Sequence, residues 1–125
     1  EPAEGLNSVL VTGVNRLLRR AVRNLLENAR RYGGRDVSVE LWTERGQAVV
    51  AVNDRGPGVP EDQRERIFEP FYRMPGASES HGGVGLGLAL VRSIAERHGG
   101  QVSCGPRDGG GARFRLTFPL RAYNK

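Results

Sequence analysis

The sequence of 125 residues has a single cysteine, Cys104, and only two histidines. One cysteine forms no intrachain disulfide, and it excludes a zinc site built from four cysteines. His81 and His98 lie far apart in the sequence, so we expect no metal site of the histidine–cysteine type. This cysteine usage fits a reducing cytoplasm.

Lysine is almost absent, since Lys125 is the only one among 19 cationic residues. A Walker A phosphate loop needs a lysine after its last glycine, and a eukaryotic-type protein kinase needs one on an internal strand. Neither site can be built from this chain. The sequence therefore excludes both of these classes of nucleotide-binding protein.

Long apolar runs and a secretory leader are also missing. No stretch approaches the ~18 apolar residues of a membrane span, and no signal peptide is visible after Glu1. The chain has the length of one domain, and we assign residues 1–125 to it. Because residue 1 is not methionine, we expect a piece of a longer protein whose membrane anchor, if it has one, lies elsewhere.

The formal net charge is +5, and nearly all of the positive charge comes from arginine. A basic balance is typical of proteins that bind nucleic acid or phosphate. The arginines are spread over predicted helices, loops and termini, however, and aromatic residues make up only 6% of the chain, too few for an evident base-stacking platform. We therefore expect no nucleic acid partner.

The hydrophobic periodicity predicts an α+β fold. Leu18, Val22, Leu25 and Ala29 form one apolar helical stripe, with Asn15 as the expected N-cap. Helices are predicted at 16–32, 61–67 and 87–98, and strands at 8–12, 37–42, 48–53, 101–104 and 112–119. A turn at 44–47 is predicted to join 37–42 and 48–53 as a hairpin. The sum is a two-layer sandwich, in which about three helices cover a mixed, mostly antiparallel sheet of about five strands.

The first predicted helix carries three polar residues on one face that are suited to bind a ligand. Asn24, Asn28 and Arg31 fall within a sector of ~60° beside the apolar stripe. Carboxamide oxygens are suitable neutral ligands for Mg²⁺, and a guanidinium complements phosphate. The alternative is an ordinary solvated helix face.

Two glycine-containing segments extend this pattern. Asp54, Gly56 and Gly58 directly follow a predicted strand, so a carboxylate there can accept a hydrogen bond from an exocyclic amine such as that of adenine. The segment 83–87, Gly-Val-Gly-Leu-Gly, opens the last helix, where backbone amides attract phosphate. The alternative for the first is an ordinary Asp-Gly turn, and the second lacks the spacing of a Rossmann fingerprint.

Two further segments are weaker on their own. The run 109–111 is three glycines before the last strand, which allows close backbone approach or simply a hairpin turn. Between the glycine segments, 68–73 reads Phe-Glu-Pro-Phe-Tyr-Arg. Its aromatic residues are suited to hold a lid, and Arg73 to reach a terminal phosphate; the alternative, core packing, is expected of Phe68 and Phe71 in either case.

In this order and spacing, the five segments resemble the ATP-binding catalytic domain of sensor histidine kinases, which belongs to the Bergerat-fold superfamily shared with DNA gyrase and mismatch-repair ATPases. Residues 24–32 look like the asparagine box of that family. The segments at 54–58, 83–87 and 109–114 look like its three glycine boxes, and 68–73 looks like its phenylalanine box. The resemblance covers a core of about 9–119.

The resemblance implies a role for each matching residue. Asp54 would hold the adenine amino group with Tyr32 near the ring, Asn28 would bind Mg²⁺ supported by Asn24, and Arg31 and Arg73 would act on the phosphates. The remaining implied ATP contacts come from backbone-rich positions: Gly56, Gly58, Gly83, Val84, Gly85, Leu86, Gly87 and Leu88. A lid of roughly residues 74–83 would close over the phosphates.

Two positions depart from or refine the family pattern. Ala112 stands where many members carry a Thr or Ser hydroxyl near the nucleotide. Asn24 stands where ATPases of the superfamily carry a glutamate that acts as general base for water, and a carboxamide cannot accept a proton in that role. We therefore expect negligible ATP hydrolysis and a preference for transfer to a protein acceptor.

The implied function is binding of Mg²⁺ and ATP followed by transfer of the γ-phosphoryl group to a histidine on a separate domain, N-terminal to this one and absent here. A response regulator would receive the phosphoryl group next. We expect this chain to be a monomeric cytoplasmic domain, and its parent to be a homodimer anchored in the bacterial inner membrane. The alternatives are an anti-sigma-type serine kinase, or a non-catalytic module of the same fold that binds ATP or, through its arginines, nucleic acid.

Overall fold

The computed structural model describes residues 16–33, 36–72 and 86–119. These ranges contain two α-helices, two short 3-10 turns and four strands, in the order α2 (Arg16–Tyr32), β1 (Ser38–Glu44), β2 (Gln47–Asn53), η2 (Glu61–Gln63), η3 (Arg66–Phe68), α3 (Gly87–Arg97), β3 (Gln101–Pro106) and β4 (Ala112–Pro119). No helix in these ranges has both the length and the apolar character needed to cross a bilayer.

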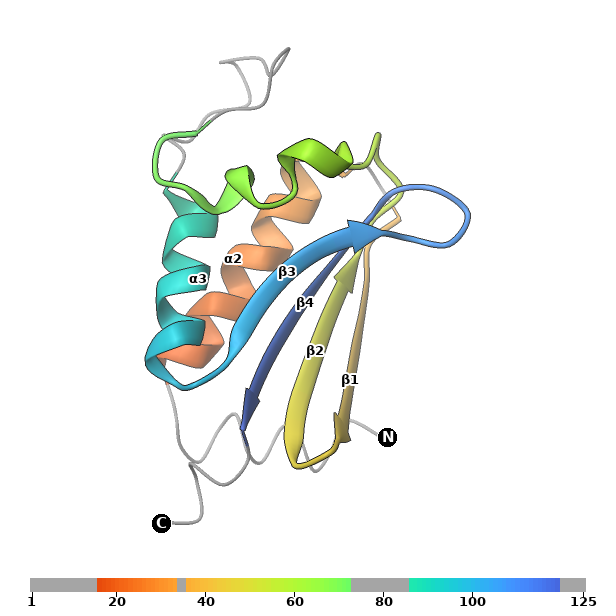
Figure 1. The fold of residues 1–125 in the computed structure, drawn as a ribbon. Helices are drawn as coiled ribbons and strands as arrows, with labels where there is room; N and C mark the ends of the chain where they lie inside the picture. Colours follow the sequence, from red (N-terminus) through yellow and green to blue (C-terminus); the bar gives the residue numbers. More distant parts are fainter. Residues whose placement is uncertain (1–15, 34–35, 73–85, 120–125) are drawn as a thin grey trace.

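The fold is a two-layer α+β sandwich, as the periodicity predicts. The sheet has the strand order β1-β2-β4-β3, and α2 and α3 lie side by side against one of its faces (Figure 1). All three strand pairings are antiparallel, and the described strands number four where about five were predicted. The other predicted strand, 8–12, lies outside the described residues.

Helix α2 has the predicted bounds and a similar buried stripe. Leu18, Ala21, Leu25 and Ala29 are fully buried, whereas Val22 is only partly buried. Their i, i+3/i+4 spacing puts them on one face of the helix, which packs on the sheet. At the C-terminal end of α2 the amide of Gly33 donates to the Ala29 carbonyl oxygen at 2.7 Å, as in the last turn of a helix. The predicted N-cap, Asn15, lies outside the described residues.

Strands β1 and β2 form the predicted hairpin. Two residues connect them, Arg45 with φ 50° and Gly46 with φ 76°. Positive φ at both central positions is the conformation that matches the twist of a two-residue hairpin. This turn sets the register that pairs Trp42 with Val49.

The segment predicted as a short helix, 61–67, is helical only in part. The chain forms two separate 3-10 turns there, with the amide of Gln63 donating to the Pro60 carbonyl oxygen at 2.8 Å and that of Glu69 to Arg66 at 2.9 Å. A segment this short gains few i→i+4 hydrogen bonds, and helix nucleation is costly, so isolated turns replace a continuous helix.

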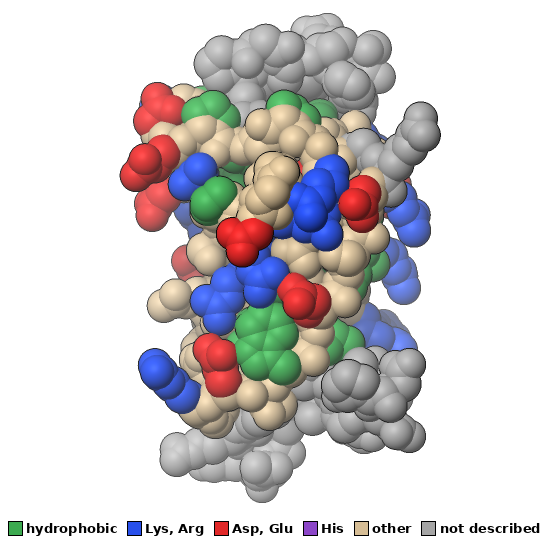
Figure 2. Space-filling model, turned by 90° about the vertical axis from the view of Figure 1, so that its right-hand side faces the viewer, with side chains coloured by type: hydrophobic (Ala, Val, Ile, Leu, Met, Phe, Trp, Pro, Cys, Tyr) green, Lys and Arg blue, Asp and Glu red, His purple; other side chains and the backbone are tan. Residues whose placement is uncertain are grey.

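The two faces of the sheet differ in chemistry. Ala48, Val50 and Val52 of β2 point into the core beneath the helices together with Phe114 and Leu116 of β4. Figure 2 looks onto the opposite face, where acidic and basic side chains alternate around an apolar patch. The arginine and carboxylate side chains of that face cover the sheet there.

On the outer face Trp42 is the central side chain. The guanidinium groups of Arg113 and Arg115 lie 5.6 and 5.9 Å from its ring centroid. Arg113 also pairs with Glu40 at 2.7 Å, and Arg115 with Glu44 at 3.3 Å. The hydrogen bond from Arg113 lowers the pKa of Glu40, and the one from the Trp42 indole lowers the pKa of Glu44. Together these contacts keep Val49 and Ala51 fully buried.

Cys104 provides a test of the packing between β3 and the helices. It packs against the core, and this burial raises the pKa of its thiol to about 12. The thiolate is the reactive form, so we expect iodoacetamide at pH 8 to alkylate the folded chain about a hundredfold more slowly than the chain in guanidinium chloride. Mass spectrometry over time measures both rates, and equal rates would contradict the buried position.

Candidate functional site

The segments singled out in the sequence meet at one end of the sandwich. The C-terminal end of α2, the residues after β2, the first residues of β4 and the N-terminal end of α3 all lie at the top of Figure 1. The β1–β2 hairpin turn is at the opposite end. The antiparallel order of the sheet explains this arrangement, because β2 ends where β4 begins.

Asp54 is the most constrained polar residue at this end. Its side chain is 5% exposed, and Oδ1 accepts hydrogen bonds from the backbone amides of Gly56 at 3.0 Å and Ala112 at 3.1 Å. Its own amide donates to the Ala112 carbonyl oxygen at 2.9 Å. Oδ2 takes no hydrogen bond from any described residue. A buried carboxylate oxygen is costly without a donor, so the site suits a ligand that supplies one, such as an exocyclic amine.

Glycines make room for this carboxylate. A Cβ on Gly33 would lie 2.4 Å from both Cβ and Cγ of Asp54, and a Cβ on Gly56 would lie 2.7 Å from the Tyr32 carbonyl oxygen. A Cβ on Gly111 would lie 1.9 Å from the Asp54 carbonyl oxygen, at a backbone φ of 109°. Any side chain at these positions would displace Asp54 or the backbone that holds it.

Arg55 fastens the glycine-rich turn before β4 to the same place. Its Nη1 donates to the carbonyl oxygens of Asp108 at 2.6 Å and Gly110 at 2.9 Å. Its Nε lies 3.7 Å from the carboxylate of Asp36, which Arg107 also approaches at 3.9 Å. The two residues after β2 therefore both bond to this turn or its end: Arg55 to the carbonyl oxygens of Asp108 and Gly110, and Asp54 to Ala112, where β4 begins.

The polar face of α2 borders the site. Asn24 donates from Nδ2 to the Gly87 carbonyl oxygen at 3.4 Å, which links α2 to the first residue of α3. Asn28 is half-buried and Arg31 is exposed on the same helix. Tyr32, the last residue of α2, is 39% exposed. The predicted group of amides and guanidinium thus faces outward next to the start of α3.

No described residue covers the start of α3. Among the described residues nothing lies within 4 Å of a Cβ placed on Gly87, and Leu86 is 43% exposed. Leu88 differs, because its side chain is partly buried against the core. Four predicted site residues lie outside the described ranges: Arg73, Gly83, Val84 and Gly85.

The aromatic segment before residue 73 divides into two parts. Phe68 is 3% exposed and meets Phe114 edge-on at 6.3 Å between ring centroids, which confirms its predicted core position. Phe71 was also predicted to pack and does not: it is 68% exposed, and its φ of 67° turns the chain away from the core. Tyr72 is held by Gln63, to which its hydroxyl donates, and by Arg66 over its ring.

Sequence reasoning missed Gly33 and Arg55. Neither residue was among the candidate site residues. Glycine directly after a polar helix face was the available signal for the first. Nothing local to Arg55 indicates that its partners lie more than 50 residues further on.

The family described as histidine kinase-, DNA gyrase B- and HSP90-like ATPase matches residues 13–122. The match covers most of the chain, and the chain belongs to this family. The fold of the described residues is likewise that of the solved relatives given below.

Individual relatives are sensor histidine kinases. The sensor protein RstB of Escherichia coli (strain K12) is 47% identical over 106 residues, which are 84% of this chain and 24% of RstB. The chain thus spans about a quarter of the length of the curated relatives that it matches. Among solved structures, the mycobacterial sensor histidine kinase MprB has a TM-score of 0.73 at 33% identity, covering 86% of this chain and 72% of that one. Full-length ShkA in complex with AMPPNP has a TM-score of 0.71 at 34% identity, covering 82% and 21%.

Gly33→Ala tests the packing around Asp54. The added Cβ would overlap the Asp54 side chain, so we expect a loss of about 1–3 kcal/mol in the free energy of unfolding, measured with urea. Gly105→Ala is the matched control, since a Cβ at Gly105 would meet nothing within 4 Å. Equal stability of the two variants would contradict the conclusion that the absence of a side chain at Gly33 makes room for Asp54.

Proposed function

We propose that this chain binds Mg²⁺ and ATP, and that it phosphorylates a histidine on another domain of its parent protein. The observation that carries the proposal is the buried Asp54, whose Oδ1 is held by two backbone amides while Oδ2 lacks a donor among the described residues. Adenine offers an amino group as the missing donor. Guanine offers a carbonyl oxygen at the equivalent ring position, which a carboxylate repels.

The residues near Asp54 fit the rest of a nucleotide. Tyr32 ends α2 next to Gly56 and is exposed enough to pack on a base, and the start of α3 at Leu86 and Gly87, which no described residue covers, suits phosphate oxygens. We also assign Gly58, Leu88 and the undescribed Gly83, Val84 and Gly85 to the nucleotide site. The AMPPNP complex of the related ShkA supports a nucleotide of this type.

The metal would be held mainly by the nucleotide. No cluster of three or more His, Cys, Asp or Glu suited to a metal ion occurs among the described residues. The half-buried Asn28 is a neutral oxygen ligand, and Mg²⁺ commonly takes one or two protein ligands together with phosphate oxygens and water. When bound, Mg²⁺ neutralises charge on the phosphates that are being transferred.

The chain's own residues would then position the reactants. Asn24 ties α2 to Gly87, so it keeps the metal-binding face and the phosphate-binding helix start together. The exposed Arg31 and the undescribed Arg73 would stabilise negative charge on the phosphoryl group. A carboxamide at Asn24 offers no general base for water, which favours transfer to an acceptor over hydrolysis.

The partners follow from the relatives, which are sensor proteins about four times as long as the matched segment. We propose an N-terminal phosphoacceptor domain in the parent, a response regulator as final recipient, and a homodimeric parent anchored in the inner membrane with this domain in the cytoplasm. Residues 1–125 would form its single catalytic domain with a core at 9–119. An anti-sigma-type serine kinase is the alternative, and the phenylalanine segment and the sensor kinase relatives disfavour it.

Calorimetric titration with nucleotides tests the adenine pocket. We expect the chain to bind ATP but not GTP, and Asp54→Asn to weaken ATP binding about tenfold or more, because the amide presents a donor where an acceptor is needed. Asp108→Asn is the control, since it makes the same chemical change at an exposed carboxyl. A folded chain without ATP affinity, or an Asp54→Asn variant that binds like the original, would refute the pocket.

Phosphotransfer tests the reaction. With γ-labelled ATP and the parent's histidine hairpin domain supplied separately, we expect an acid-labile phosphoprotein, little free phosphate, and about a hundredfold slower transfer by Asn28→Ala. Acid-stable label would indicate a serine acceptor and favour the alternative. Rapid phosphate release without a labelled acceptor would indicate an ATPase.

A further inference from the structure

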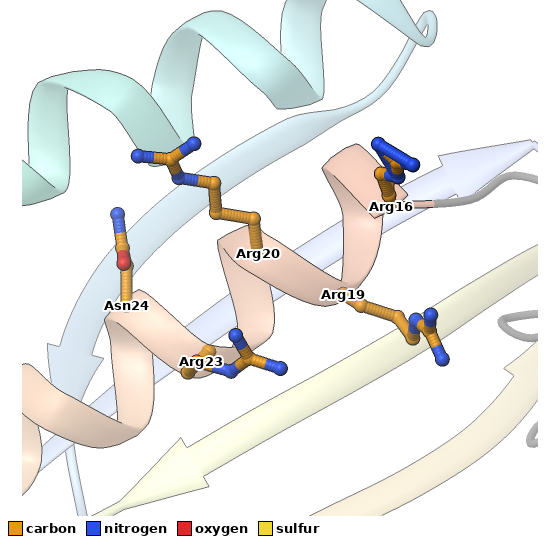
Figure 3. Close-up of a pocket in the computed structure, with 5 residues that line it drawn as sticks. All are labelled: Arg16, Arg19, Arg20, Arg23 and Asn24. Carbon is orange, nitrogen blue, oxygen red and sulfur yellow. The ribbon is translucent and has the colours of Figure 1, made fainter.

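Four arginines gather on the N-terminal half of α2. Arg16, Arg19, Arg20 and Arg23 are all exposed, and together with Asn24 they line one surface pocket. Figure 3 shows these side chains on successive turns of the helix, with Arg20 and Asn24 directed toward α3 and Arg19 directed away from it. We call the four arginines the α2 arginine surface.

This surface lacks neutralising partners within the described part of the chain. Its arginines form no salt bridge or hydrogen bond there with another described residue. Glu27, the one acid of α2, pairs instead with Arg30 at 3.8 Å. On the outer face of the sheet, in contrast, Arg113 and Arg115 each have a carboxylate. Other described arginines without a salt bridge do not form a group of four on one helix face; Arg45, for example, lies in the β1–β2 turn and Arg97 at the end of α3.

The position of these charges is unfavourable for the helix itself. The first turn of α2 contains no acid, so its cations face the positive end of the helix dipole. Arg16–Arg20 and Arg19–Arg23 are also like-charge pairs at i, i+4, which repel. A sequence that was shaped only for folding would place acids here, so the arrangement points to a negatively charged partner.

The shape of the surface limits what that partner is. The arginines lie within a sector of about 100° and span about 10 Å along the helix axis. A lipid bilayer would call for apolar side chains to insert beside the charges, but Leu18, Ala21 and Leu25 are fully buried. Single-stranded nucleic acid would call for stacking aromatics, and the exposed large hydrophobic residues are elsewhere: Tyr32, Val39, Phe71 and Leu86.

We propose that the α2 arginine surface docks an acidic protein surface on which carboxylates repeat once per helical turn. Acidic residues at i and i+4 of a helix have Cβ atoms about 6 Å apart, the same spacing as Arg16 to Arg20 or Arg19 to Arg23. Guanidinium groups bind carboxylates through paired hydrogen bonds, which makes arginine suited to this register.

The α2 arginine surface lies away from the base-binding Asp54 and adjoins the nucleotide site only at Asn24. Arg16 and Tyr32 are the two ends of α2, about 24 Å apart along its axis, and Asp54 lies against Gly33, which directly follows Tyr32. Docking at the α2 arginine surface can therefore be tested independently of ATP binding. Asn24 lines the pocket but contacts Gly87, so it is left unchanged in the test.

The test is fluorescence anisotropy of a labelled helical peptide that carries Glu at every fourth position. We expect the 125-residue chain to bind it at about 0.02 M salt and to release it at about 0.5 M salt. Arg19→Gln/Arg23→Gln should weaken binding about tenfold. Arg45→Gln/Arg97→Gln, which removes the same charge elsewhere, should change it less than about twofold. A peptide with Gln in place of Glu should not bind.

Three outcomes would overturn the proposal. Equal losses in the two double variants would mean that only the net charge matters. Tighter binding of a DNA duplex or a phosphatidylserine vesicle than of the peptide, lost in the same variant, would assign the surface to a different class of partner. A lower melting temperature of Arg19→Gln/Arg23→Gln would mean that these arginines serve the fold, since removal of repelling charges should leave it unchanged or raise it.

Discussion

The bonds between Asp54 and Ala112 connect everything else at the candidate site. They continue the β2–β4 pairing one residue beyond the end of β2. The Asp54 amide donates to the Ala112 carbonyl oxygen at 2.9 Å, and the Ala112 amide donates to the Asp54 carboxylate. Because β2 and β4 are the central strands and carry most of the buried core, the position of this carboxylate is as rigid as the sheet. A hydrogen-bond acceptor fixed in this way can discriminate between bases.

The same constraint explains why the neighbourhood is rich in glycine. Gly33 at the end of α2 faces the Asp54 side chain, and Gly111 in the turn before β4 faces the Asp54 carbonyl oxygen. Gly56, after β2, faces the backbone of Tyr32 and Gly33. Arg55 then closes the turn over the site through two backbone carbonyls. The glycines thus serve clearance around the carboxylate as well as turn geometry, and the candidate site depends on contacts within the protein before any ligand arrives.

The two layers differ in how far their arginines are neutralised by carboxylates. The exposed face of the sheet is covered by Trp42 and by arginine–carboxylate pairs, which shield the buried Val49 and Ala51 without a second layer of helices. The exposed face of α2 has an excess of arginine that its own acid does not balance. A neutralised sheet and a basic helix leave the net positive charge of the described residues concentrated on one side, which is suited to attract an acidic partner from solution.

Local patterns in the sequence determined α2, the hairpin between β1 and β2 and the burial of Phe68, because each follows from residues within a few positions of one another. The tertiary structure decided the contacts between residues that are far apart in the sequence. Asp54 meets Ala112 and Arg55 meets Asp108 across more than 50 residues, and Gly33 is needed only because the fold brings α2 to the end of β2. Phe71 was misread because an apolar side chain is buried only where the fold supplies a surface to cover it, and Phe71 is 68% exposed. The 61–67 segment forms two short 3-10 turns, because the few i→i+4 hydrogen bonds that it could gain do not offset the cost of helix nucleation.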